Sequence, residues 1–168
     1  MQTIYLAGGC FWGLQKYMDQ FEGVLATEVG YANGPEDAAG NGPGGAPTYQ
    51  DVCANSGHAE TVKIDFDPEV LPPEKLLNLY FEVIDPLSVN RQGHDTGVQY
   101  RTGIYYTDEA LLPAVKSVFS AQQEKAGQPL AVAVEPLRNF FPAEEYHQKY
   151  LDKNPGGYCH IPASYFSR

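Results

Sequence analysis

The sequence predicts an α+β fold: a mixed sheet with helices packed against it in a two-layer, ferredoxin-like core, followed by a long coil-rich C-terminal tail. Short segments rich in β-branched and aromatic residues alternate along the chain with segments of helical apolar spacing. Clusters of glycine and proline separate these segments. With 168 residues, the chain is long enough to bury a core and lies in the single-domain range. We therefore expect one domain over residues 1–168, whose tail occupies residues 152–168.

The first half of the chain is predicted to contain strands around one helix. A strand over residues 3–7 runs through two glycines into a helix that begins at Phe11 and has apolar residues at helical spacing. Residues 24–31 form a strand of β-branched and aromatic residues, and residues 60–66 alternate between apolar and polar side chains as a half-buried strand does. Residues 32–47 form a loop, because five glycines and three prolines prevent regular structure there.

The second half continues the alternation of helices and strands. Pro72-Pro73 favours the start of a helix, and Asp85-Pro86 favours its end. The remaining expected elements are a strand over residues 101–106, a helix that ends near Gly127, a strand over residues 131–135 and a short helix from Pro142 through Leu151. Asparagine, proline and glycine at residues 154–157 then break the chain into the tail.

The charge of the chain argues against two classes of partner. Its net charge of −10 disfavours binding to nucleic acids or anionic membranes, because both require basic patches. No apolar run approaches the ~18 residues of a membrane span. The N-terminal end also lacks the basic and apolar regions of a signal peptide. We expect a cytoplasmic protein that binds neither nucleic acid nor membrane.

The three cysteines, Cys10, Cys53 and Cys159, do not form a disulfide scaffold or a metal motif. Their number is odd and too small to staple a fold of this size. None are spaced as C-x-x-C, which excludes a zinc ribbon and a thioredoxin-type motif. We therefore expect no metal, and we expect catalysis or redox cycling as the use of these thiols. Cys53 is predicted to be a buried packing residue.

Cys10 is the first candidate for chemistry. It follows Gly8-Gly9 at the transition from a strand to a helix, and Phe11-Trp12 places an apolar wall beside the sulfur. The N–H groups and the positive dipole end of a helix N-terminus favour a thiolate over a thiol. A reactive cysteine that faces an apolar group is one interpretation. The other is a small buried residue at a turn, a common position for free cysteines.

Glu60 is the second candidate, because its position in a strand gives it the parity of the apolar face. Val62, Ile64 and Phe66 share that face. Burial raises the pKa of a carboxyl group and lets it keep a proton near neutrality, which a general acid requires. The alternative is a frayed strand end at which Glu60 reaches water.

Residues 92–101 form a polar, glycine-containing loop of the kind that carries function. Asp95 and Tyr100 offer a hydrogen-bond acceptor and a donor, although a turn-forming Asp and a packed Tyr explain them equally well. Tyr49, in Pro47-Thr48-Tyr49, is open to the same two interpretations.

Five sets of residues in register carry a family resemblance. They are GGCFWG, PTYQDVC, SGHAE, QG-x-D-x-G-x-QYR around Asp95, and AEEYHQKYL followed by NPGGYC. In this order they resemble the peptide methionine sulfoxide reductases of the A type, from Ile4 to about Cys159. Each motif alone is weakly specific, whereas five in the same order are strongly specific.

The resemblance implies a role for each matching residue in the chemical step. Cys10 is the nucleophile, which attacks the sulfoxide sulfur and becomes a sulfenic acid. Phe11 and Trp12 pack against the methyl group of the substrate. Glu60 protonates the sulfoxide oxygen. Tyr49 and Tyr100 hydrogen-bond to that oxygen, and Asp95 supports the polar side of the site.

The resemblance also implies how the enzyme is regenerated. Cys159 forms a disulfide with Cys10, which thioredoxin or another dithiol then reduces, and Gly156-Gly157 before it suits a thiol that must move. No cofactor is implied. The expected partners are oxidised proteins, free methionine sulfoxide and thioredoxin, and the chain is expected to act as a monomer on the S epimer.

Two other classes of function remain open from the residues. A cysteine hydrolase or acyltransferase would use Cys10 with His58 or His147 as its base. A non-catalytic module would bind peptides through its tyrosines. Packing or solvation explains both histidines as well.

Overall fold

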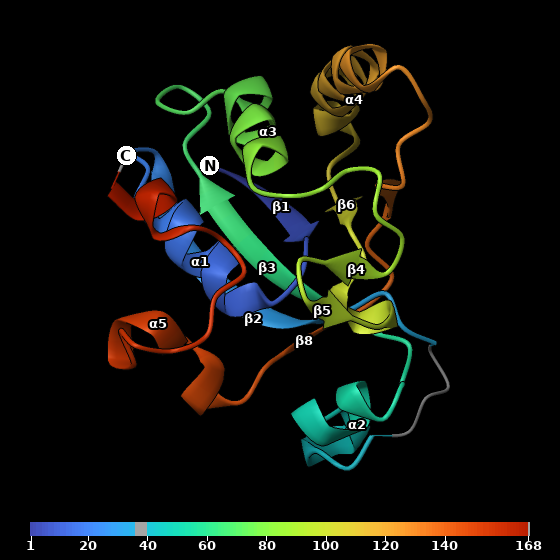
Figure 1. Cartoon of the computed structure of the whole chain (residues 1–168), viewed down its shortest axis with the longest axis vertical. Helices are drawn as coiled ribbons and strands as arrows, with labels where there is room; N and C mark the ends of the chain where they lie inside the picture. The colour runs from blue at the N-terminus through green and yellow to red at the C-terminus, as the bar shows by residue number, and fades with distance from the viewer. Residues whose placement is uncertain (36–39, 168) are drawn as a thin grey trace.

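The computed structural model describes residues 1–35 and 40–167. The described strands are β1 (Gln2–Ala7), β2 (Val24–Ala32), β3 (Ala59–Phe66), β4 (Arg91–Gln92), β5 (Asp95–Thr96), β6 (Gly103–Tyr106), β7 (Ala133–Pro136) and β8 (Phe140–Pro142). The described α-helices are α1 (Phe11–Asp19), α2 (Tyr49–Cys53), α3 (Pro73–Glu82), α4 (Leu112–Ala126) and α5 (Tyr150–Lys153). Figure 1 shows how they surround the central strands.

The main sheet confirms the predicted mixed α+β class. In the described part of the chain its strand order is β7-β6-β1-β3-β2-β8. The four inner strands are antiparallel neighbours, and in the chain they alternate with α1 and α3 as strand–helix–strand–strand–helix–strand. This order is the ferredoxin-like arrangement. β7 extends the sheet in parallel with β6, and β8 pairs with β2.

The core lies on the helix-covered face of the sheet. Leu6 of β1 is paired with Val62 of β3, and Ile4 with Ile64 two residues earlier. These side chains share one face because alternate residues of a strand point the same way. Apolar residues of α1, α3 and α4 pack into the same cluster (Figure 1). The other face carries a smaller cluster of Tyr5, Ala7, Ala32, Ala59 and Tyr105.

The expected helix over residues 142–151 is wrong. Phe140–Pro142 pairs with β2 as β8, a 3₁₀ turn covers Glu145–His147, and α5 begins only at Tyr150. Gln148 explains the difference, because its side chain accepts a hydrogen bond from the Val29 N–H (3.0 Å) and donates one to the Val29 carbonyl (2.9 Å). These bonds hold the segment along the strand edge in place of a continuous helix.

The predicted loop over residues 32–47 is partly ordered. β2 continues through Ala32, and Pro43–Gly45 forms a 3₁₀ turn in which Gly44 and Gly45 have positive φ angles. Residues 36–39 of this predicted loop lie outside the described residues.

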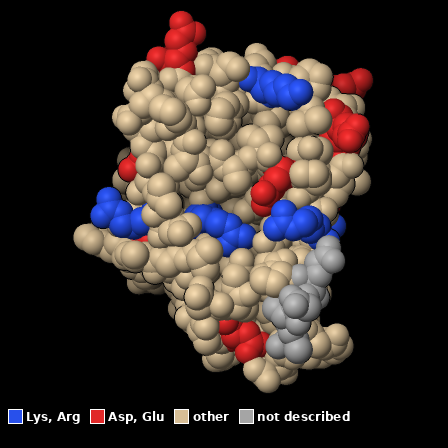
Figure 2. All heavy atoms as spheres, turned by 90° about the vertical axis from the view of Figure 1, so that its right-hand side faces the viewer, with Lys and Arg blue, Asp and Glu red and all other residues tan. Residues whose placement is uncertain are grey.

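The face shown in Figure 2 is mostly uncharged, and acidic and basic side chains are scattered over it. No described helix is long and apolar enough to cross a membrane.

Candidate active site

Cys10 lies at the junction between β1 and α1, where it is the N-cap residue and not part of the first helical turn. Its side chain is 7 % exposed. Gly9 before it has a φ of +78°, a conformation that residues with side chains rarely adopt. The Gly9 N–H donates to the Tyr100 carbonyl at 3.2 Å, which joins this turn to the 3₁₀ turn Val98–Tyr100.

The expectation that the helix end favours a thiolate on Cys10 is wrong for the protein without substrate. Burial raises the pKa of the Cys10 thiol well above its ordinary value, and the nearby Glu60 carboxyl raises it further. A hydrogen bond from the Trp12 backbone opposes these effects but is the smaller contribution. The free enzyme therefore holds Cys10 as a thiol.

Glu60 is buried at the start of β3, as its parity predicts, with 1 % of the residue exposed. One carboxyl oxygen, Oε1, accepts the Phe11 N–H at 3.1 Å. The other, Oε2, is buried without a hydrogen-bond partner among the described residues. Burial raises the pKa of Glu60 to about 8, so the carboxyl keeps its proton at neutral pH. The group is therefore set up to donate a proton or a hydrogen bond.

Phe11 and Trp12 form the apolar wall that the sequence predicts beside Cys10. Trp12 stacks on Tyr150 with ring centres 3.7 Å apart, and its indole Nε1–H donates to Nδ1 of His147 at 3.0 Å. Phe11 is buried, and its ring lies 5.7 Å from that of Tyr31. These contacts fix both rings, because stacking and a directed hydrogen bond each restrict side-chain rotation.

Glu144 and His147 organise this wall. Glu144 is not among the candidates predicted from the sequence, and His147 is a candidate there only as the base of a hydrolase. The carboxylate of Glu144 accepts the Tyr49 N–H at 3.0 Å and the Tyr31 hydroxyl at 2.9 Å. His147 is buried, and its ring lies 4.6 Å from that of Tyr49. Both belong to the AEEYHQKYL stretch, and this motif was the feature of the sequence that could have indicated their place in the site.

Tyr49 is held at the start of α2 by its neighbours. The Thr48 side chain accepts the Asp51 N–H, and the Asp51 carboxylate accepts the Thr48 N–H in return, a capping box. Burial raises the pKa of Tyr49, with a hydrogen bond to Cys53 as the next cause. The Tyr49 hydroxyl therefore remains a proton donor at neutral pH.

Asp95 and Tyr100 face the same region as Cys10 and Glu60. Burial raises the pKa of Tyr100, and the charges of Glu60, Cys10 and Asp95 raise it further. Asp95 likewise contributes to the raised pKa values of Cys10 and Glu60. The Tyr100 carbonyl accepts the Gly9 N–H, and Oδ2 of Asp95 lies 3.9 Å from Nδ1 of His160, whose ring packs against Gly9. The structure therefore brings Asp95 and Tyr100 close to the Cys10 turn.

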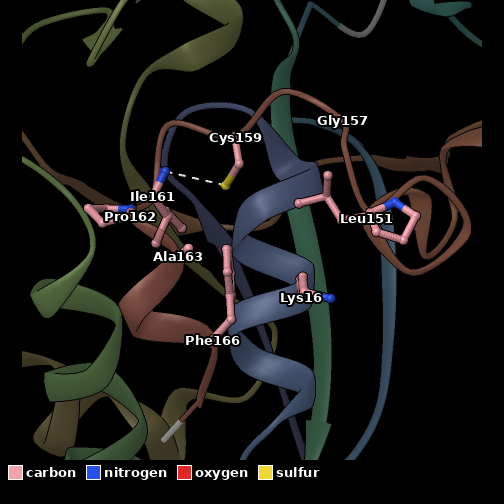
Figure 3. Close-up of a pocket in the computed structure, with 9 residues that line it drawn as sticks. Lys16, Leu151, Gly157, Cys159, Ile161, Pro162, Ala163 and Phe166 are labelled. Atoms are coloured by element: carbon pink, nitrogen blue, oxygen red, sulfur yellow. Dashed lines mark hydrogen bonds between the residues drawn. The ribbon is translucent and has the colours of Figure 1, made fainter.

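Cys159 and Cys53 lie in different environments. Cys159 is half-buried beside α1, and its Sγ accepts the Ile161 N–H at 3.3 Å (Figure 3). It borders a cavity of about 330 Å³ lined mainly by apolar side chains of the tail. Cys53 is exposed, so the expectation of a buried packing residue is wrong. The short α2 leaves the Cys53 side chain in solvent.

The two histidines considered as bases for Cys10 have other partners. Nδ1 of His147 accepts the Trp12 indole N–H, and Nδ1 of His58 lies 2.9 Å from the Ser56 hydroxyl. The His58 ring also packs against Gly34. Among the described residues no group of three His, Cys, Asp or Glu side chains is placed to hold a metal ion.

A ferredoxin-like sheet that carries a buried cysteine, a protonated carboxyl and an aromatic wall defines a cysteine-dependent enzyme. Residues 2–168 match the family model "Peptide methionine sulfoxide reductase", and the chain belongs to that family, as its A-type member. It is 57 % identical over 161 residues to the peptide methionine sulfoxide reductase MsrA of Lachnoclostridium phytofermentans, which covers 95 % of this chain and 92 % of the relative. Identity to MsrA of Clostridium acetobutylicum is 52 %, with 96 % of each chain covered. The reduced form of Mxr1 from Saccharomyces cerevisiae superposes with a TM-score of 0.89 at 36 % identity, covering 96 % of this chain and 91 % of Mxr1.

Proposed function

We propose that this reductase converts the S epimer of methionine sulfoxide, free and in proteins, to methionine by forming a sulfenic acid on Cys10. The protonated, buried Glu60 carboxyl beside the Cys10 turn is the observation that carries the proposal. A sulfoxide oxygen is a poor leaving group until it is protonated, so an acid of raised pKa is the group that the reaction requires.

In the proposed step the Cys10 sulfur attacks the sulfoxide sulfur while Glu60 transfers its proton to the sulfoxide oxygen. The S–O bond of the substrate and the sulfur–sulfur bond made by the attack both break, and the hydroxyl group ends on Cys10 as a sulfenic acid. The thiol proton of Cys10 returns to Glu60, which restores the acid. The substrate gains two electrons and leaves as methionine, while Cys10 is oxidised by the same two electrons.

The proposed recognition of the substrate divides between two sides of the site. Phe11 and Trp12 contact the methyl group. The hydroxyls of Tyr49 and Tyr100 donate to the sulfoxide oxygen, and Asp95 completes the polar side. A thioether would leave these buried donors unpaired, so the site favours sulfoxide over methionine. Methyl wall, oxygen donors and thiol fix three directions around the sulfur, which selects one epimer.

We further propose that Cys159 resolves the sulfenic acid as a disulfide and that thioredoxin reduces it, with no cofactor involved and the chain acting as a monomer. Condensation of the Cys10 sulfenic acid with the Cys159 thiol forms the S–S bond and releases water. A dithiol then reduces the Cys10–Cys159 disulfide and is itself oxidised to a disulfide. Mxr1, the yeast relative, is the subject of a structure in complex with Trx2, a thioredoxin, which supports this choice of reductant.

Assay of both resolved sulfoxide epimers with dithiothreitol tests this function. We expect methionine from the S epimer alone. Equal rates on the two epimers contradict the proposed geometry around sulfur. Release of product from an acyl ester without any reductant favours the cysteine hydrolase, and binding without turnover favours a non-catalytic module.

A further inference from the structure

The tail is already packed against α1 in the reduced protein, at the two glycines that flank the Cys10 turn. A Cβ atom built on Gly13 would lie 2.6 Å from the Sγ of Cys159. A Cβ atom built on Gly9 would lie 2.8 Å from Cε1 and 2.9 Å from Nε2 of His160. Successive tail residues therefore occupy the places that side chains would take at both glycines.

Gly13 has no local reason to be glycine. It lies inside α1, where glycine is a poor helix former, and its backbone conformation is one that any residue can adopt. It follows Cys10 by three residues, which is about one helical turn. The close approach of Cys159 is the feature of the structure that requires a bare backbone at this position.

The sulfur of Cys159 is also held by a hydrogen bond within the tail. The Ile161 N–H donates to it at 3.3 Å, as Figure 3 shows. Ile161 is 3 % exposed, and its Cδ1 would lie 3.3 Å from a Cβ on Gly13. A methyl group at residue 13 would therefore collide with the Cys159 sulfur and crowd Ile161, so the tail would have to shift or Cys159 to rotate. Either movement takes the sulfur away from α1.

We propose that Gly13 is a positioning residue for disulfide formation, because its bare backbone seats the Cys159 sulfur about one turn of α1 from Cys10. This inference rests on the proposed role of Cys159 in resolving the sulfenic acid. This packing of Cys159 against Gly13, which we call the seat, keeps the second thiol next to α1 before oxidation. Disulfide formation then requires a local shift of residues 159–161 and not the closure of a free tail. Orientation of this kind is worth large factors in rate, since a misplacement of ~1 Å can cost roughly 10²-fold.

The rate of disulfide formation in Gly13→Ala tests the seat. In a single turnover with one equivalent of the sulfoxide, we expect methionine to form at the wild-type rate, because Cys10 and Glu60 are unchanged. The Cys10–Cys159 disulfide should form at least ~10-fold more slowly, with a dimedone-reactive sulfenic acid accumulating in the interval. Ser164→Ala, at an exposed position of the tail beyond Cys159, is the matched control. Wild-type disulfide formation in Gly13→Ala, or equal slowing in Ser164→Ala, overturns the proposal.

Alkylation of Cys159 tests the same seat without any sulfoxide. In a Cys10→Ser/Cys53→Ser background, Cys159 is the single remaining thiol. Gly13→Ala should make it react several-fold faster with iodoacetamide, because the sulfur leaves its half-buried position. An unchanged alkylation rate overturns the seat. Faster alkylation in this background, together with no methionine formed by the protein that retains all three cysteines, would support the packing of Cys159 against Gly13 and reject the proposed function, so the two failures are distinguishable.

Discussion

The backbone N–H of Phe11 donates to Oε1 of Glu60 at 3.1 Å, which joins the first turn of α1 to the first residues of β3. This bond aims the carboxyl at the residue that follows Cys10 and leaves Oε2 without a partner among the described residues. Burial and the unpaired Oε2 make this carboxyl costly to ionise, and burial outweighs the Phe11 N–H bond, which favours the carboxylate. The carboxyl therefore keeps its proton at neutral pH.

Replacing Glu60 with glutamine should slow methionine formation by roughly 10²-fold or more, the usual contribution of a positioned acid. Glutamine keeps an oxygen that can accept the Phe11 N–H, so the change removes the proton and little else. In the wild type the rate should fall as the pH rises through about 8, where Glu60 loses its proton. The variant should lack this alkaline limb. An unchanged rate and pH profile would leave Glu60 as a structural residue.

The same substitution should change how stability depends on pH, independently of activity. The pKa of Glu60 is raised in the folded protein, from 4.5 to about 8. Between these values the unfolded chain releases a proton that the folded protein retains. The free energy of unfolding therefore falls as the pH rises, by up to ~1.4 kcal/mol per pH unit.

Glu60→Gln lacks this loss, so its free energy of unfolding minus that of the wild type should increase from pH 5 to pH 8. Urea denaturation at both values measures the difference. Glu69→Gln, at an exposed carboxyl, is the matched control for the removal of one charge. A difference between Glu60→Gln and wild type that does not vary with pH contradicts the buried, protonated carboxyl.

Cys10 should be the single thiol required for the chemical step. Cys10→Ser should abolish methionine formation in a single turnover, because a hydroxyl oxygen cannot take the place of the sulfur as nucleophile and oxygen acceptor. Cys53→Ser should retain the wild-type rate, since Cys53 is exposed and serine keeps a hydrogen-bonding atom near Tyr49. Methionine released in one turnover can be quantified by chromatography. Full activity in Cys10→Ser would move the nucleophile elsewhere.

Local patterns predict the elements of the sheet and the burial of Glu60. Strand parity is a period of two residues, so the side of β3 that Glu60 faces can be read from Val62 and its neighbours. Likewise, two glycines before an apolar helical pattern place Cys10 at the start of α1. These predictions succeed because each depends on a few consecutive residues.

Contacts between distant parts of the chain decide what the sequence could not predict. His147, which accepts the Trp12 indole N–H, lies 135 residues from Trp12 in the sequence. Glu144, which accepts the Tyr49 N–H, lies 95 residues from Tyr49. The pKa of Cys10 was expected to be low from the helix end alone. Its environment includes β3 and the tail, whose burial of the thiol outweighs the helix terminus. Exposure of Cys53 depends on how α2 lies on the surface, which composition does not reveal.

Cys159 should form the disulfide that consumes the Cys10 sulfenic acid. Its sulfur lies against Gly13 in the reduced protein, so it is close to the nucleophile before any substrate binds. A disulfide needs about 4–7 Å between the two Cα atoms, which a local movement of the tail would have to provide. Mass spectrometry after one equivalent of sulfoxide should therefore detect a Cys10–Cys159 peptide pair.

Cys159→Ser should release one equivalent of methionine and then accumulate a sulfenic acid that thioredoxin turns over poorly, because serine cannot form the S–S bond that thioredoxin attacks. A Cys10–Cys53 disulfide, or undiminished thioredoxin-linked turnover in Cys159→Ser, would show that another group resolves the sulfenic acid.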